Sequence, residues 1–425
     1  MRTGGCMPIL CFQLASPVDP AADAKAAAAE AGRPACGRPL RVVIAGGGTG
    51  GHLFPGIAVA EEIRARGACN QVLFVSRGNE FERAALARAG FTLETISVEG
   101  LKGRGLRNQA RVIIHLPGSV VQSARRLRGF RPDLVIGLGS YSAGPVVVAA
   151  WLLRIPIALC EQNTLPGITN RVLARLADRI FTSFEQTGGF DPHRVLWTGN
   201  PLRREIVRAA ARGTAAHPPA PHRLFTVLVI GGSQGAHSIN MAVAAALERL
   251  PGRNRFFFIH QTGTADEAQV REAYRRAGTD ARVQAFFDDM DVQYRQADLA
   301  VCRAGATTVA EITALGKPAV YIPFPFAADD HQRLNAQRMV EAGAAEMIAE
   351  DQLSAERLGE RIGFYASHPE ALARLAERAA RLGKPDAAQR IVNECCRLVA
   401  GRSTGQPADG AGRGETGRAC QRPPV

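Results

Sequence analysis

Two glycine-rich turns constrain the fold of this chain more than any other feature of its sequence. The first, Gly46–Gly51, follows the apolar stretch Arg41–Ala45 and precedes a helical pattern of apolar residues. The second, Gly231–Gly235, follows the apolar stretch Phe225–Ile230 and also leads into a helical pattern. A strand, a glycine turn and a helix in this order are typical of a parallel, doubly wound sheet. We therefore expect an α/β protein made of two Rossmann-like halves that face a cleft.

Changes in composition divide the chain into five segments. Residues 16–39 are rich in Ala, Pro and Gly without periodicity, the stretch 209–221 holds Gly213 and three prolines, and the chain after about residue 400 is rich in Gly, Arg, Thr and Pro. The predicted segments are a disordered extension (1–39), a first half (40–203), a linker (204–222), a second half (223–399) and a disordered tail (400–425).

Charge and cysteine content narrow the class of protein. With 52 Lys and Arg against 39 Asp and Glu, the formal net charge is +13, which suits an anionic lipid, a phosphorylated substrate or nucleic acid, although genomic base composition produces the same excess of arginine. The nine cysteines form no C-x-x-C pair, so we expect neither a disulfide framework nor a zinc site, and a reducing cytosol fits. No apolar run reaches the roughly 18–20 residues that span a bilayer.

The first glycine turn is a candidate site for an anion, because glycines let backbone N–H groups approach a phosphate and the dipole of the following helix favours negative charge. Its Gly46-x-Gly48-x-x-Gly51 spacing also matches a dinucleotide fingerprint, and Arg77 suits an NADP phosphate, so an NADP-dependent oxidoreductase stays an alternative. His52 follows the turn directly. An ordinary histidine pKa of about 6.5 suits proton removal from a sugar hydroxyl, so His52 is a candidate general base, with a purely structural role as the alternative.

Two further strand ends in the first half carry distinctive loops. Gly137–Pro145 is a second glycine-rich loop and contains Tyr141. Two such loops in one half favour a backbone cradle for a large anion such as a diphosphate lipid. Glu161, Gln162 and Asn163 follow the next strand, where carboxamides are suited to holding sugar hydroxyls. A helix cap or turn at Asn163 is the alternative.

The second half adds groups suited to a nucleotide sugar. Its glycine turn should place Ser233 and neighbouring amides on a diphosphate, and Arg203, at the junction between the halves, is within reach of the same anion. The stretch Cys302–Glu311 reads as a strand end, a turn of small residues and a helix start. The small residues leave room for phosphate, and Glu311 is placed where it can accept both ribose hydroxyls. Gln332 and Asn335 are three residues apart and share a helix face that can read sugar hydroxyls. The alternative for Arg203 is a solvated surface position, and that for Glu311 is an ordinary surface glutamate. The alternative for Gln332 and Asn335 is an ordinary helix cap.

Taken together, these stretches resemble the motifs of the MurG family of glycosyltransferases, in the same order and at similar spacing. They are Gly46–Pro55, Gly137–Pro145, Glu161–Asn163, Gly199–Arg203, Gly231–Ala236, Phe287–Met290, Arg303–Glu311 and Asp330–Ala336, and the resemblance covers roughly Leu40–Val399. It implies a GT-B fold and an inverting transfer of N-acetylglucosamine (GlcNAc) from UDP-GlcNAc to the muramyl 4-hydroxyl of undecaprenyl-diphospho-MurNAc-pentapeptide, in peptidoglycan synthesis. The chain departs from the family pattern at its two ends and at Ser140, where a second glycine is commoner.

The resemblance also implies roles for individual residues. It assigns Thr49, Gly50 and Gly51 to the donor sugar, Asn163 and Gln332 to GlcNAc, Arg203 and Ser233 to the nucleotide, Phe287 to uracil through its backbone, Ala306, Thr307 and Thr308 to the phosphates, and Glu311 to the ribose. Asn335 joins the predicted sugar contacts. His52 is the predicted catalytic base, with Tyr141 and Glu161 as further catalytic candidates. We expect no cofactor and no metal ion.

The lipid on the predicted acceptor implies that the protein reaches a bilayer. The stretch Leu101–Arg131 mixes apolar and basic residues, and we expect it to dock on an anionic membrane surface, with a core helix carrying a solvated basic face as the alternative. The expected location is the cytoplasmic face of the cell (inner) membrane, as a peripheral protein. The expected partners are UDP-GlcNAc, the lipid-linked muramyl-pentapeptide and the membrane, and not nucleic acid. Another GT-B glycosyltransferase, for instance one acting on other glycolipids, stays an alternative.

Overall fold

Two parallel sheets form in the computed structural model, which describes residues 38–98, 106–212, 224–232, 235–250 and 252–403. The first sheet has seven strands in the order β3 (Thr92–Thr95), β2 (Gln71–Ser76), β1 (Arg41–Ala45), β4 (Leu134–Gly137), β5 (Ile157–Glu161), β6 (Arg179–Thr182) and β7 (Val195–Trp197). The second has six strands in the order β10 (Asp280–Gln284), β9 (Phe256–Gln261), β8 (Phe225–Ile230), β11 (Leu299–Cys302), β12 (Ala319–Tyr321) and β13 (Glu346–Met347). The predicted α/β class with two doubly wound sheets is confirmed.

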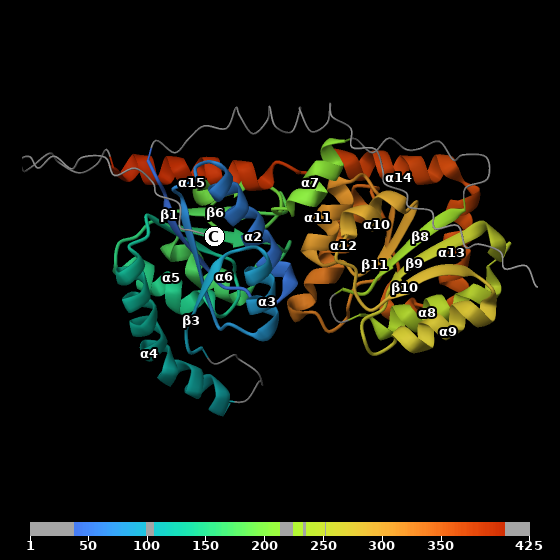
Figure 1. The fold of residues 1–425 in the computed structure, drawn as a ribbon, viewed down its shortest axis with the longest axis horizontal. Helices are drawn as coiled ribbons and strands as arrows, with labels where there is room; N and C mark the ends of the chain where they lie inside the picture. Colours follow the sequence, from blue (N-terminus) through green and yellow to red (C-terminus); the bar gives the residue numbers. More distant parts are fainter. Residues whose placement is uncertain (1–37, 99–105, 213–223, 233–234, 251, 404–425) are drawn as a thin grey trace, which may run out of the picture. The chain divides into compact units, whose positions relative to one another are not determined.

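Helices follow most strands, as the sequence pattern predicts. The first half contains α2 (Gly50–Ala65), α3 (Glu80–Arg88), α4 (Leu106–Phe130), α5 (Ala143–Leu152) and α6 (Ile168–Leu173), and α7 (Arg204–Ala211) follows its last strand. The second half contains α8 (His237–Ala246), α9 (Glu267–Ala277), α10 (Met290–Gln296), α11 (Ala306–Ala314), α12 (His331–Glu341), α13 (Ala355–Ser367) and α14 (Pro369–Leu382), and α15 (Ala387–Ser403) ends the described chain. Figure 1 shows these helices around the two sheets.

Both faces of each central strand are buried, which explains why the strands read as continuous apolar runs. In β1, Val42 and Ile44 join the core that includes residues of α2, whereas Val43 and Ala45 join the core beneath α5. Successive side chains of a strand point to opposite faces, so one strand serves both cores. The second sheet repeats the arrangement, with Leu228 and Ile230 in one core and Val227 and Val229 in the other.

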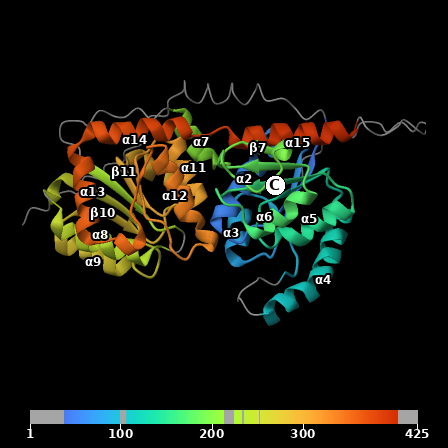
Figure 2. The ribbon, with the colours of Figure 1, turned by 180° about the vertical axis from the view of Figure 1, so that it is seen from behind.

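Two helices lie where the sequence did not predict them. Residues 204–211, expected in the linker, form α7, which buries Ile206 and Ala209 in a core of the second half. The C-terminal α15, expected with the second half up to residue 399, packs along α2 in the first half and contributes Ile391, Val392 and Cys395 to that core. Figure 1 and Figure 2 both show α15 beside the first sheet.

A buried arginine anchors α15 to the first half. The Arg66 guanidinium donates to Oδ1 of Asn393 at 2.7 Å and to the carbonyl of Gln389 at 2.9 Å, and it pairs with Glu62 at 2.8 Å. Since Asn393 and Gln389 lie more than 320 positions away in sequence, no local pattern predicts these two partners. The predicted extension and tail fall mostly outside the described residues, and none of the described helices is both long and apolar enough to cross a membrane.

Candidate active site

The first glycine turn depends on backbone conformations that only glycine adopts easily. Gly46, Gly47 and Gly48 have φ values of +103°, +156° and +94°. A Cβ on Gly47 would lie 2.3 Å from Oε1 of Glu82, and the Gly48 N–H donates to the same oxygen at 2.6 Å. Glu82 is in turn fixed by a reciprocal capping pair with Asn79 at the start of α3. The buried carboxylate of Glu82 therefore stabilises the conformation of this turn.

Helix α2 begins at Gly50, within the last residues of this turn, and no side chain caps its first amides. Thr49 is the N-cap, with extended backbone and no side-chain hydrogen bond to the helix. Thr49 and Gly51 are exposed, and Gly50 between them is half-buried. The uncapped N–H groups at the positive end of the helix dipole are suited to an anion or a sugar oxygen. The structure thus places the three predicted donor-sugar residues together, and their role stays a prediction.

His52 lies in the first turn of α2, and its ring is hydrogen-bonded. Its Nδ1 is 2.9 Å from Oε1 of Gln162, at the end of β5. With the amide oxygen as acceptor, Nδ1 carries the proton, and Nε2 is the ring nitrogen that can accept one. Burial lowers the pKa of His52 below 6.5, against the opposing effects of the Glu161 charge and of hydrogen bonds to Gln162 and to the backbone of Leu138. An oriented imidazole that is neutral at pH 7 has the properties of a general base.

Glu161, the second catalytic candidate, is buried and serves its own loop. Oε1 accepts the Asn163 N–H at 2.9 Å, and Oε2 accepts the Gly167 N–H at 3.2 Å and Nδ2 of Asn170 at 2.8 Å. Three hydrogen bonds to one carboxylate fix the path of the loop between β5 and α6. This placement favours a role in holding Gln162 and Asn163 in position over direct proton transfer.

Tyr141, the third catalytic candidate, lies in the loop after β4 and is partly exposed. Its hydroxyl accepts a hydrogen bond from Nη1 of Arg77 at 3.2 Å. The neighbouring Ser140 accepts the Gly47 N–H through Oγ at 3.1 Å, so the hydroxyl at this position joins the first two glycine loops. The serine that replaces the commoner glycine at position 140 therefore makes a hydrogen bond that a glycine could not make. Arg77, on which the NADP alternative depends, is engaged with Tyr141.

Asn335 joins the two halves. It is fully buried, and its Oδ1 accepts both the N–H of Thr164 at 3.0 Å and the hydroxyl of Thr164 at 3.1 Å. Its Nδ2 donates to the carbonyl of Ala304 at 3.2 Å and to Oδ1 of Asn163 at 3.3 Å. All the hydrogen-bonding capacity of this amide is used within the protein. The structure thus favours a tether at Asn335 over the predicted sugar contact.

Asn163 and Gln332 keep the exposure that a sugar contact needs. Both are half-buried, and Oδ1 of Asn163 accepts from Asn335. Gln332 accepts the N–H of Phe324 through Oε1 at 3.1 Å, which fixes the loop that precedes α12. Their predicted contacts with GlcNAc stay predictions.

Arg203 and Glu311, predicted to bind different parts of the nucleotide, bind each other. Nη2 of Arg203 lies 2.8 Å from Oε1 of Glu311, and the hydroxyl of Tyr294 donates to Oε2 at 3.0 Å. Burial lowers the pKa of Arg203, but the charge and hydrogen bond of Glu311, together with Tyr294 and Glu205, outweigh it, and the pKa is raised. A carboxylate has about four acceptor positions, and Nε and Nη2 of Arg203 and the hydroxyl of Tyr294 use three of them, so one remains on Glu311 for a ribose hydroxyl.

Helix α11 presents the predicted phosphate residues at its N-terminus. Gly305 is its N-cap and offers no side-chain cap, so the first amides are not used by a capping side chain. Thr307 donates from Oγ1 to the carbonyl of Gly51 at 3.2 Å, which brings the two helix starts together. Ala306 is buried and Thr308 half-buried. A cavity of about 330 Å³ lies against another face of α11, and of the predicted site residues it includes Ala306 alone among its lining.

The second glycine turn is described only in part, and Ser233 lies outside the described residues. Gly232 accepts Nε2 of Gln261 at 3.0 Å through its carbonyl. The same Gln261 accepts the N–H of Phe287 at 3.2 Å, and the Phe287 side chain is buried. The N–H of Phe287 is therefore occupied by Gln261, and the predicted contact of the Phe287 backbone with uracil stays a prediction.

Sequence reasoning missed several residues that position this site. Gln162 lay within a noted motif but was not chosen, although its place after a strand end beside the histidine loop was a usable signal. Gln261 and Tyr294 carried no signal, because a single polar residue in an apolar segment is usually structural. Among the described residues, no group of three or more His, Cys, Asp and Glu side chains is placed to hold a metal ion.

Comparisons with known proteins agree with this arrangement. Residues 42–182 match the N-terminal domain of glycosyltransferase family 28, and residues 226–391 match its C-terminal domain. The chain belongs to glycosyltransferase family 28. The predicted second Rossmann-like half is thus a family 28 C-terminal domain. An NADP-dependent oxidoreductase would not need such a domain, so the oxidoreductase alternative is not retained.

Within family 28 the chain is similar to enzymes named UDP-N-acetylglucosamine–N-acetylmuramyl-(pentapeptide) pyrophosphoryl-undecaprenol N-acetylglucosamine transferase. One from Anaeromyxobacter sp. (strain Fw109-5) is 46% identical over 91% of this chain and 99% of the relative, and one from Myxococcus xanthus is 44% identical over 85% and 93%. The crystal structure of MurG from Acinetobacter baumannii matches with a TM-score of 0.69 at 28% identity, covering 84% of this chain and 99% of that one. The resemblance to the MurG family and the expected GT-B fold are confirmed.

Proposed function

We propose that this protein transfers GlcNAc from UDP-GlcNAc to the muramyl 4-hydroxyl of undecaprenyl-diphospho-MurNAc-pentapeptide. The observation that carries the proposal is the 46% identity, over nearly the whole length, to a relative named for this transfer. The motif residues add support. The N-terminus of α2 in the first half lies beside the N-terminus of α11 in the second half, and no side chain caps either helix. Another GT-B transferase is less well supported, since the similar relatives carry this one name.

The donor is proposed to occupy the second half. Its ribose is held by Glu311, and its diphosphate lies at the N-termini of α8 and α11, with Arg203 near the nucleotide. Helix dipoles and amides there stabilise the charge that develops on the departing UDP. The GlcNAc unit lies toward Asn163, Gln332 and the first turn of α2. This places the anomeric carbon between the two halves.

The reaction exchanges one bond at the anomeric carbon. The muramyl 4-hydroxyl oxygen forms a bond to that carbon as the bond to the diphosphate oxygen breaks, which inverts the configuration and gives a β-1,4 linkage. Nε2 of His52 takes the hydroxyl proton, and UDP leaves with the bonding electron pair. Gln162 keeps the His52 ring in the required tautomer through Nδ1. Glu161 acts through the loop that carries Gln162.

The test is transfer of radiolabelled GlcNAc from UDP-GlcNAc to a short-chain lipid-linked muramyl-pentapeptide. We expect product formation that depends on both substrates, with UDP released in equal amount. UDP-GlcNAc binding without transfer to this acceptor would keep the donor and contradict the acceptor. Loss of both binding and transfer would contradict the proposal as a whole.

We further propose that the first half docks on the cytoplasmic face of the cell (inner) membrane, as a peripheral protein. Residues 101–105 of the predicted docking stretch lie outside the described residues, as do the side chains up to residue 115. The described part of α4 exposes Leu116 and Val121 and carries Arg125, Arg126 and Arg128 on its surface. Basic residues near anionic lipid contribute roughly 1 kcal/mol each.

The apolar surface continues beyond α4. Helix α5 packs against α4 and against α6, and Figure 2 shows α5 and α6 beside each other. Trp151 and Leu152 at the end of α5 are 52% and 59% exposed, and Ile168 and Val172, four apart on α6, are 63% and 64% exposed. Large exposed apolar residues gathered on neighbouring helices are typical of a membrane or partner surface. Insertion of these side chains would add to the electrostatic attraction.

Replacing Trp151 and Val172 together by serine is expected to lower binding to vesicles containing phosphatidylglycerol by about tenfold, because less apolar surface enters the bilayer. The measurement is vesicle flotation at fixed salt. Val340→Ser, which removes another exposed apolar side chain but on α12, is the matched control and should bind as the parent does. Equal flotation of the double variant and the parent would contradict the proposed surface.

A further inference from the structure

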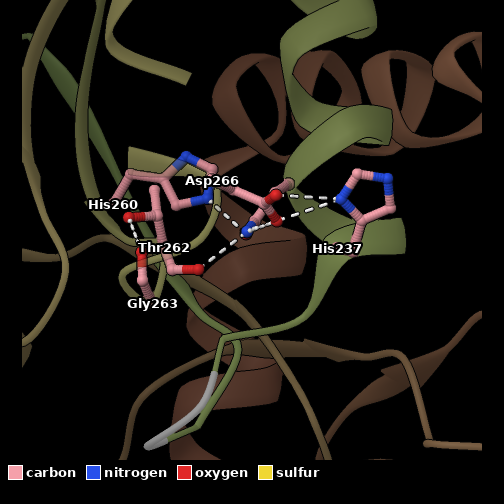
Figure 3. Close-up of polar contacts among 6 residues, drawn as sticks. His237, His260, Thr262, Gly263 and Asp266 are labelled. Carbon is pink, nitrogen blue, oxygen red and sulfur yellow. Dashed lines mark hydrogen bonds and ion pairs between the residues drawn. The ribbon is translucent and has the colours of Figure 1, made fainter. Parts of the chain in front are cut away.

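A row of buried polar side chains lies beneath the second glycine turn and joins the end of β9 to the start of α8. His260 and Asn240 are fully buried in it, with Nε2 of His260 3.0 Å from Oδ1 of Asn240. Nδ2 of Asn240 donates to the carbonyl of Thr262 at 2.8 Å and to Oδ2 of Asp266 at 2.8 Å. Asp266 also binds Nδ1 of His237, the first residue of α8, at 3.0 Å. Figure 3 shows Asp266 lying between His260 and His237.

The hydrogen-bond directions in this row follow from the groups present. Asn240 uses both N–H bonds on acceptors, so its Oδ1 must face His260, whose Nε2 then carries the proton. Burial lowers the pKa of His260 to about 3, so the ring is neutral and its Nδ1 is an acceptor. The hydroxyl of Tyr274, 3.1 Å away, donates to it, and burial raises the pKa of Tyr274 and keeps that proton in place. Every member has one fixed orientation.

The row ends at the Asp266 carboxylate, which binds the first residue of α8. Burial would raise the pKa of Asp266, but the hydrogen bonds from Asn240 and His237 outweigh it and lower that pKa. Asp266 therefore stays ionised at neutral pH and keeps its hold on His237. The next residue of α8, Ser238, accepts from Nη2 of Arg303 at 3.1 Å through Oγ. The first turn of α8 is thus fixed from two sides, while no side chain caps its amides.

The same row controls the approach of β9 to the glycine turn. A Cβ on Gly235 would lie 2.0 Å from the carbonyl oxygen of Thr262, the oxygen to which Asn240 donates. The two backbones therefore approach each other more closely than any residue with a Cβ would allow. A shift of Asn240 or Asp266 would therefore move Gly235 and the amides that follow it into α8.

We propose that Asp266 and Asn240 are positioning residues for the diphosphate of the nucleotide-sugar donor. They act through His237, Thr262 and Gly235, which set the direction of the uncapped amides at the start of α8. This inference rests on the proposed function, in which the donor diphosphate lies at that helix start. The uridine is proposed to lie elsewhere, near Glu311, and does not depend on this row.

The inference separates binding of the phosphates from binding of the nucleoside. In Asp266→Ala we expect the affinity for UDP to fall about tenfold, because the preorganised amides lose their fixed direction, while the affinity for uridine stays within about twofold. The KM for UDP-GlcNAc should rise about tenfold with kcat changed less than about threefold. Asp266→Asn, whose amide oxygen can still accept from Asn240, should lie between the parent and the alanine variant.

The measurement is calorimetric titration of the full chain with UDP and, separately, with uridine, together with the thermal midpoint of each variant. Glu267→Ala is the matched control, because it removes the neighbouring carboxylate, which pairs with Arg271 on the exposed face of α9. Glu267→Ala should leave both affinities unchanged. Equal losses for UDP and uridine, or no loss for UDP, would overturn the positioning role. A parent protein that binds no UDP would overturn both this inference and the proposed function.

Discussion

Replacing His52 by alanine is expected to lower kcat for GlcNAc transfer by about 10²- to 10⁴-fold, the usual contribution of a positioned general base. The reason is the orientation of the ring, whose Nδ1 is bound to Gln162 so that Nε2 is the proton acceptor. The KM for UDP-GlcNAc should change much less, because the base acts on the acceptor hydroxyl. Steady-state transfer with both substrates varied measures the two effects separately.

The pH profile gives an independent check on the same residue. Because burial lowers the pKa of His52 below 6.5, the neutral, basic form persists to lower pH than in an ordinary histidine. As the pH falls, kcat should therefore decline below pH 6.5 and not at or above it, and this acid limb should vanish in His52→Ala. His193→Ala, at an exposed histidine far along the chain, is the control. Near-normal turnover of folded His52→Ala would show that another group is the base.

Replacing Glu311 by alanine is expected to have the second largest effect, on both donor binding and stability. Removing the carboxylate leaves Arg203 and the hydroxyl of Tyr294 without their buried partner, and breaking a buried ion pair costs about 3–5 kcal/mol. The KM for UDP-GlcNAc should rise about 100-fold, since the hydrogen bond to the ribose is lost together with the site geometry. Thermal unfolding and donor kinetics measure the two losses.

A milder variant separates the ribose contact from folding. Glu311→Gln keeps the size of the side chain and an oxygen acceptor for Arg203, although it removes the negative charge, so less stability should be lost than in Glu311→Ala. The decisive comparison is UDP with 2′-deoxy-UDP: the parent should prefer UDP, and Glu311→Gln should lose about tenfold of that preference. Glu341→Ala, which removes an exposed carboxylate paired with Arg338, is the control for charge. An unchanged preference in Glu311→Gln would place the ribose elsewhere.

Much of the fold was predictable because local physics specifies it. Strands buried on both faces read as apolar runs, and the turns after β1 and β8 require glycine because a Cβ would meet Glu82 or the Thr262 carbonyl. These signals lie within short stretches of chain. They were sufficient to predict two doubly wound halves and the strand ends that carry the candidate site.

The prediction weakened where a residue's partner lies far along the chain. Arg203 and Glu311 were each assigned to ligand, but they bind each other across 108 positions. Asn335 was assigned to sugar on its helical spacing from Gln332, whereas tertiary packing uses its whole amide to join Thr164 and Ala304. A residue's spare hydrogen-bonding capacity depends on its neighbours in space, which spacing along a helix does not reveal.

By itself, then, the sequence determined the fold class, the two halves and the family, because glycine turns and apolar periodicity act through the nearest few residues. Only the tertiary structure decided that α15 returns to the first half, that His52 is oriented by Gln162, and that Asp266 reaches the second glycine turn through Asn240 and His237. Each of these depends on a buried contact between distant segments. Such contacts form because burial requires each polar group to find a partner, and which partner is nearest depends on how the sheets and helices pack.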